Sequence, residues 1–131
     1  MTKEVQDLLE KTDKFMMRNN GVQTYILISN EYVLIPSQNL YFRLDDVNTA
    51  LDFKCKVIAW VTGFCVHKHR YNHCYKYANL SKDYINFILG TDFSFEDIEN
   101  IYRPFGNGIN HDLLVKFIES GYDMKFLKEE C

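Results

Sequence analysis

The sequence predicts an α+β domain in which an N-terminal helix and a small antiparallel β-hairpin or sheet precede a bundle of about four helices. Apolar side chains recur at helical spacing over residues 2–18, and residues 23–44 contain short segments rich in β-branched and aromatic residues. Helical spacing then returns and continues to about residue 121. With 131 residues, 47% of them hydrophobic, the chain can build one core, so we expect a single domain over 1–131.

The first predicted helix covers about residues 2–18. Acidic residues occur in its first turn and basic residues in its last, the order that the helix dipole favours. Gly21 follows and can take the left-handed conformation that ends many helices. One face is expected to be buried, and it consists of Val5, Leu8, Leu9, Thr12 and Met16.

Two strands are predicted next, over residues 23–29 and 32–36. The two residues between them, Asn30 and Glu31, predict a hairpin turn. Residues 40–44 alternate apolar and polar side chains and predict a third strand. So few strands need helices to cover one face.

A long second helix is predicted to start at Asp45 and Asp46 and to reach Cys65. Its apolar residues recur at helical spacing, with Cys65 at the end of the buried stripe and Cys55 off it. The apolar period stops after Cys65, so the helix is expected to end there.

Three shorter helices complete the prediction. Ser81 is expected to cap a helix over 82–89 that Gly90 closes. The next helix begins with a capping box of Ser94 and Asp97, and Pro104 is expected to end it near residue 103. The last helix is expected to begin after the cap Asn110 and to end at residue 121.

Composition narrows the class of protein. The sequence contains no apolar run of about 18 residues, so no membrane-spanning segment is expected. The charged N-terminal segment is unlike a signal peptide, which predicts a cytoplasmic protein with reduced cysteines. Four cysteines in such a compartment indicate metal binding or burial rather than disulfides.

The segment FCVHKHRYNHCY, residues 64–75, concentrates potential metal ligands in an otherwise ordinary chain. Thiolate and imidazole are the ligands that Zn²⁺ prefers, and four of them complete a structural site. The sequence therefore predicts a metal-binding insert that holds one structural Zn²⁺. Its candidate ligands are Cys65, His67, His69, His73 and Cys74.

Two backbone geometries could bring these ligands together. In an extended chain Cys65, His67 and His69 point to one side, and His73 or Cys74 supplies the fourth bond. In a helix Cys65, His69 and His73 share a face. A third interpretation needs no metal, because Cys65 is simply buried and the histidines belong to a basic loop that faces solvent.

A catalytic metal is not expected. Residues 53–82 contain no acidic side chain that could shuttle protons, and the sequence contains no H-E-x-x-H motif. We therefore predict that the protein is not an enzyme.

The charge of the chain, −3 overall, is unevenly distributed. Residues 54–76 carry five bases and no acid, interleaved with tyrosines, which is compatible with a small nucleic-acid-binding or regulatory protein. Residues 77–131 carry a net charge of −5, and the helix predicted after Asn110 has too few bases to grip phosphates. Direct nucleic-acid binding is therefore the second interpretation.

Two parts of the chain resemble known phage proteins. The run LGTDFSFEDIENIYRPFGNGINHDLLVKFIESGYDMKFL, residues 89–127, is similar to a C-terminal segment of phage proteins of unassigned function. Over its whole length, the plan with the CVHKHRYNHC insert resembles the zinc-containing type II-A anti-CRISPR proteins of streptococcal phages. The resemblance implies a phage-encoded inhibitor that acts in the host cytoplasm. Such an inhibitor binds Cas9 directly, at its recognition lobe, and blocks the loading of target DNA.

This resemblance predicts that the acidic residues contribute to binding the partner protein. Cas9, or another host defence nuclease, is strongly basic along its nucleic-acid channel and would attract an acidic surface. The densest candidate patch for partner binding consists of Asp92, Glu96, Asp97 and Glu99.

Overall fold

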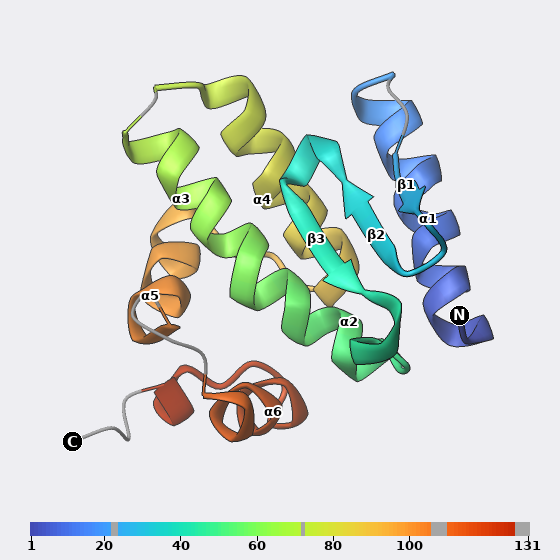
Figure 1. Ribbon diagram of the computed structural model, residues 1–131. Coiled ribbons are helices and arrows are strands. Elements are labelled where there is room, and N and C mark those ends of the chain that lie inside the picture. Colours follow the sequence, from blue (N-terminus) through green and yellow to red (C-terminus); the bar gives the residue numbers. More distant parts are fainter. Residues whose placement is uncertain (22–23, 72, 106–109, 128–131) are drawn as a thin grey trace.

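The computed structural model describes residues 1–21, 24–71, 73–105 and 110–127, and it has the α+β fold that the sequence predicts. Helix α1 and a three-stranded sheet come first, and helices follow (Figure 1). The elements are α1 (Lys3–Asn19), β1 (Ile26–Ile28), β2 (Tyr32–Ile35), β3 (Leu40–Arg43), α2 (Ala50–Lys56), α3 (Thr62–Arg70), α4 (Tyr75–Leu89), α5 (Phe95–Phe105) and α6 (His111–Glu119).

The first helix follows its prediction closely. The Thr2 side chain caps α1 by accepting a hydrogen bond from the Val5 backbone N–H at 3.4 Å. Gly21 has φ +65°, the left-handed conformation expected after the helix end. The buried face of α1 consists of Val5, Leu9, Thr12 and Met16.

The sheet is antiparallel in the order β1-β2-β3, so the predicted third strand is confirmed. The hairpin turn lies one residue earlier than predicted, because its central residues are Ser29 and Asn30. Both have positive φ, and the Glu31 N–H donates to the Ile28 carbonyl at 3.0 Å. A turn of this type matches the twist of the flanking strands, whereas a turn centred on Asn30 and Glu31 would need positive φ at the less suited Glu31.

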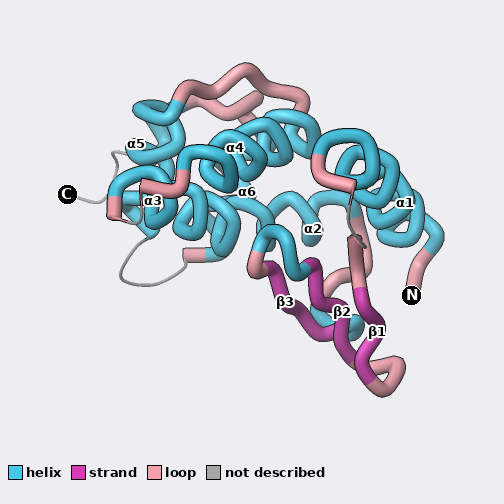
Figure 2. Tube along the Cα trace, turned by 90° about the horizontal axis from the view of Figure 1, so that it is seen from above, coloured by secondary structure: helices cyan, strands magenta, loops and turns pink. Residues whose placement is uncertain are grey.

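The sheet covers one side of the helical layer (Figure 2). Alternate residues of β2 and β3 are buried against the helices, as the period of a strand requires. The edge strand β1 exposes all three of its residues. The buried sheet residues are Val33, Ile35, Leu40 and Phe42.

The long second helix begins later than predicted. Asp45 and Asp46 form a short 3₁₀ turn, and α2 starts at Ala50. Thr49 and Asp52 form a capping box, with reciprocal hydrogen bonds of 3.1 Å each. The reciprocal bonds satisfy two backbone N–H groups, which fixes the helix start at this point.

A π-helical turn, Val57–Val61, joins α2 to α3 in one continuous helix. The prediction that Cys55 lies off the buried face is wrong, because its side chain is only 6% exposed. A π turn adds a residue to the helix and rotates the faces before and after it relative to each other. Residues on both sides of the turn can therefore face the core.

Helix α4 is longer than predicted, because it begins at Tyr75 rather than after Ser81. Ser81 lies in its interior, where the hydroxyl donates to the Tyr77 carbonyl at 2.8 Å. This local bond uses the side chain that the sequence suggested as a cap. Gly90 closes the helix with φ +69°, as predicted.

The remaining caps are confirmed, and one helix end is not. Ser94 and Asp97 form the predicted capping box at α5, and the Asn110 side chain accepts from the Leu113 N–H at 3.1 Å. Pro104, expected beyond the end of α5, lies inside its last turn. A proline removes the hydrogen bond that its N–H would donate four residues back and crowds that carbonyl, so at this position the disruption is confined to the last turn of α5.

Candidate binding surface at the α3–α4 turn

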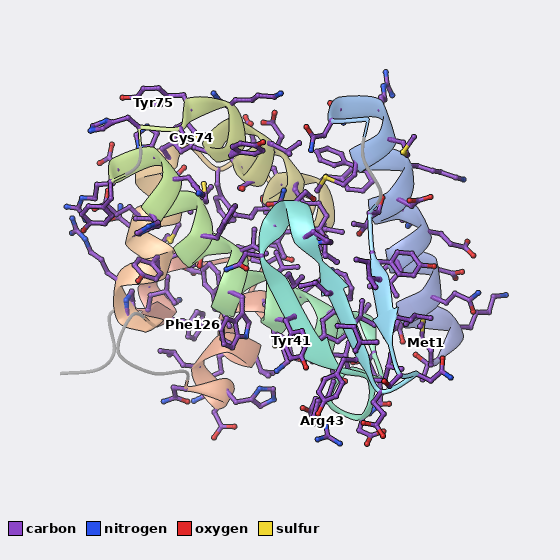
Figure 3. The ribbon with its side chains drawn as sticks, turned by 45° about the horizontal axis from the view of Figure 1, so that its top comes forward. Met1, Tyr41, Arg43, Cys74, Tyr75 and Phe126 are labelled. Atoms are coloured by element: carbon purple, nitrogen blue, oxygen red, sulfur yellow. The ribbon has the colours of Figure 1, made fainter. Side chains whose placement is uncertain are left out.

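The predicted metal ligands lie where α3 ends and α4 begins (Figure 3). Helix α3 continues to Arg70, so His67 and His69 are helical rather than part of an extended segment. The turn closes with a hydrogen bond of 3.0 Å from the Cys74 N–H to the Lys68 carbonyl. His73 lies outside the helix with φ +51°. The helical alternative therefore holds as far as Arg70 and fails at His73.

Cys65 belongs to the core between α3 and α4. Its side chain is fully buried, and the thiol donates to the Ala78 carbonyl at 3.5 Å. Burial raises the pKa of this thiol to about 12, so it holds its proton at neutral pH. A metal ligand must be a thiolate, and this environment disfavours that form.

The three histidines contact aromatic neighbours, and two of them, His69 and His73, share Tyr75. The His69 ring stacks on Phe95 of α5 with centroids 4.0 Å apart and an interplanar angle of 21°. The His67 ring lies 5.6 Å from that of Tyr71, and the His73 ring lies 6.5 Å from that of Tyr75. Cys74 is half-buried at the start of α4.

These positions do not bring the donors together. In the part of the chain that the structure describes, no group of three or more His, Cys, Asp or Glu side chains is placed to hold a metal ion. As the structure places them, Cys65, His67, His69, His73 and Cys74 do not form a preformed four-ligand site. Zinc stays a prediction of the sequence.

Elemental analysis of protein purified without added metal tests that prediction. The ligand pattern predicts one zinc per chain and its loss in Cys65→Ala and His69→Ala. That result would require the end of α3 to rearrange around the ion. If the purified wild-type protein contained no zinc and its circular dichroism spectrum still showed folded helices, the zinc prediction would be refuted.

Exposed tyrosines surround this turn. Tyr71 is 62% exposed and Tyr75 is 54% exposed, and Tyr77 is exposed beside them. Figure 3 shows Tyr75 at the end of the molecule, far from Tyr41 on the sheet. We call Tyr71, Tyr75 and Tyr77, with the neighbouring Arg70, the tyrosine surface.

The tyrosine surface is fixed to α5. The Arg70 guanidinium forms an ion pair with the Glu99 carboxylate at 2.9 Å, and Arg103 approaches the same carboxylate at 3.6 Å. The stacking of His69 on Phe95 holds the same helices together. These contacts join the end of α3 to α5 beside the exposed rings, of which Tyr71 directly follows α3 and Tyr75 and Tyr77 lie in α4.

The predicted acidic patch is smaller than the sequence indicates. Asp92 and Glu96 are exposed. Asp97 accepts a hydrogen bond of 3.0 Å from the Ser94 N–H in the capping box, and Glu99 is paired with Arg70. Two of the four carboxylates thus act inside the fold, and Asp92 and Glu96 are free to meet a partner.

The basic segment 54–76 does not form one patch. Lys54 and Lys56 lie in α2, whereas Lys68, Arg70 and Lys76 lie near the α3–α4 turn. Residues 56 and 68 are separated by roughly 18 Å along a helix. A single nucleic-acid contact over the whole segment is therefore not favoured.

A separate cavity of about 140 Å³ is lined by Cys55 and His111, together with Asp46 and Asp52. These residue types can form a nucleophilic site, but burial and the nearby Asp52 carboxylate raise the pKa of Cys55 to about 11. The thiol is therefore protonated at neutral pH and is a poor nucleophile.

Comparison with known protein families, curated proteins and solved structures gives no match for this chain. Among the described residues, none of the helices combines the length and apolar character needed to cross a membrane. The site must therefore be interpreted from its own geometry.

Proposed function

We propose that the protein inhibits Cas9 by direct binding through the tyrosine surface and so blocks the loading of target DNA. The resemblance of the whole plan, with its CVHKHRYNHC insert, to type II-A anti-CRISPR proteins suggests the target. The observation that carries the proposal is the exposure of Tyr71, which directly follows α3, and of Tyr75 at the start of α4. Tyrosine and arginine are enriched among the residues that dominate protein–protein binding energy.

The fixed position of these rings favours tight binding. A side chain that is ordered before binding loses less conformational entropy when the complex forms. Contacts to two of the rings supply this order, because the Arg70 guanidinium lies 5.6 Å from the centroid of the Tyr71 ring and the His69 ring packs edge-on against Tyr75 with centroids 5.6 Å apart. The tyrosine surface therefore has the properties of a preorganised protein-binding site.

An acidic side chain accompanies the bases Lys68, Arg70 and Lys76 at this end of the molecule. The exposed Glu96 follows Phe95, whose ring stacks on His69 at the same end of the molecule. A carboxylate there would repel phosphates but would complement the basic side chains of a nucleic-acid-binding protein such as Cas9. Asp92 and Glu96 are thus expected to contribute to the association rate with Cas9.

The binding experiment compares the wild-type protein with Tyr71→Ala/Tyr75→Ala for affinity to a Cas9–guide RNA complex. Removal of two central aromatic rings is expected to weaken binding by roughly 30-fold or more, since each such residue contributes about 2 kcal/mol. Tyr41→Ala is the matched control, because Tyr41 is 46% exposed but lies on the sheet. It should retain wild-type affinity.

Failure of the wild-type protein to bind any Cas9–guide RNA complex would contradict the proposal. Equal losses in the double variant and in Tyr41→Ala would assign the effect to something other than this surface. If the protein instead bound duplex DNA with steep salt dependence, and lost it in Lys68→Gln/Lys76→Gln, the nucleic-acid interpretation would replace the proposal.

A further inference from the structure

A second surface, separate from the tyrosine surface, lies between α1 and α4. Helix α1 packs beside α4, as Figure 2 shows, and a groove of about 570 Å³ runs between them. This volume is in the range of pockets that hold small ligands. The groove is lined by Lys11, Lys14, Phe15, Arg18, Asn19 and Phe87.

Two phenylalanines form an aromatic platform in the groove. The rings of Phe15 and Phe87 are stacked, with centroids 5.0 Å apart and an interplanar angle of 25°. This stacking does not bury Phe87, whose side chain is 46% exposed. Tyr84 of the same helix, by contrast, is completely buried. A large aromatic face is therefore available for contact with a flat ligand.

Three cations accompany the platform. Lys11, Lys14 and Arg18 are exposed at successive turns of α1, and none forms an ion pair with a residue that the structure describes. They extend over roughly 10 Å of the helix. Acids border the cations on the same side of α1, since Asp7 lies one turn before Lys11 and Glu10 lies one turn before Lys14.

We propose that this groove binds single-stranded nucleic acid. Stacked aromatic rings beside a row of cations are the features by which proteins hold single strands without sequence preference. The three cations can each contact one phosphate of the strand. A base stacks on Phe87, and the phosphates contact Lys11, Lys14 and Arg18. An acidic polypeptide would use the cations but would leave the aromatic platform unused.

This site is independent of the tyrosine surface. Its residues come from α1 and the C-terminal half of α4, whereas the tyrosine surface lies at the α3–α4 turn. Absence of nucleic-acid binding in the groove would therefore not contradict Cas9 inhibition, and absence of Cas9 inhibition would not contradict nucleic-acid binding in the groove.

The experiment measures the fluorescence anisotropy of labelled dT12 with the full chain at several salt concentrations. We expect saturable binding, with log Kd rising by about 2 per tenfold increase in salt for three phosphate contacts. Lys11→Gln/Lys14→Gln/Arg18→Gln should abolish most of this slope. The control Lys3→Gln/Lys116→Gln/Lys125→Gln changes the net charge equally at exposed lysines outside the groove and should bind as the wild type does.

Phe87→Leu tests the platform, because leucine keeps an apolar contact with Phe15 but removes the aromatic face. We expect about a five- to 150-fold weaker affinity for dT12, the loss of one stacked base, with an unchanged circular dichroism spectrum. Absence of dT12 binding, or equal losses in the groove and control triple variants, would overturn the proposal. So would binding of a 12-residue polyglutamate as tight as that of dT12 and unaffected by Phe87→Leu, because it would assign the groove to an acidic polypeptide.

Discussion

Tyr84→Ala is expected to lower the free energy of unfolding by about 3–5 kcal/mol, the usual cost of removing a buried aromatic ring. Tyr84 is fully buried in α4 and anchors α1. Its hydroxyl lies 3.1 Å from that of Thr12, and its ring lies 5.8 Å from that of Phe15. Removal of the ring leaves a cavity between α1 and α4 that these neighbours cannot fill.

Urea denaturation followed by circular dichroism measures this loss. Tyr84→Phe is the control, because it keeps the ring and removes only the hydroxyl. Thr12 then retains its 2.8 Å hydrogen bond to the Leu8 carbonyl, so we expect a loss of about 0.5–1.5 kcal/mol. Similar losses in the two variants would show that α1 does not depend on the buried ring.

Stability is expected to fall steeply as the pH rises above 9. Burial raises the pKa of Cys65 to about 12 and that of Cys55 to about 11, and it also raises the pKa of Tyr84. Between pH 9 and 11 the unfolded chain loses thiol protons that the folded chain keeps. The unfolded state is therefore favoured, by roughly 1.4 kcal/mol per pH unit for each thiol. Below pH 9 both states are protonated and this contribution to stability is fully present.

Urea midpoints at pH 7.5, 9 and 10.5 measure this dependence. Cys55→Ala/Cys65→Ala should flatten the decline between pH 9 and 10.5, because it removes both buried thiols. A decline of equal slope in this variant would show that other groups cause the alkaline loss.

Local signals in the sequence predicted much of the fold. The predicted caps Ser94 and Asn110 lie next to the helices that they start, and a side-chain oxygen can reach its backbone partner whatever the rest of the chain does. Gly21 and Gly90 end helices for an equally local reason. The first two strands followed from β-branched and aromatic residues, and the third from its alternation.

The errors arose where tertiary packing decides. The π turn at Val57–Val61 shifts the helical faces, so a regular period placed Cys55 outside the core. Helix α3 continues past Cys65 because His69 stacks on Phe95, a contact between residues 26 positions apart. The spacing of apolar residues treats histidine as polar, so it does not detect a histidine that packs as an aromatic ring.

The candidate site shows the same limit. The sequence established that five potential ligands lie close together along the chain, but not where their side chains point. Cys65 turns towards Ala78, and the histidines pack against the aromatic rings of Tyr71, Phe95 and Tyr75. Similarly, the sequence could not show that Glu99 pairs with Arg70 instead of facing a partner. The groove between α1 and α4 was missed because its two sides are far apart in sequence, although Lys11, Lys14 and Arg18 at helical spacing were a visible signal.

Cleavage of target DNA by Cas9 with guide RNA tests the central claim most directly. The wild-type protein, added before the DNA, should suppress cleavage, whereas Tyr71→Ala/Tyr75→Ala should not and Tyr41→Ala should act as the wild type does. Protein added after the DNA has loaded should have little effect. Undiminished cleavage in the presence of excess wild-type protein, or full inhibition by the double variant, would contradict the account.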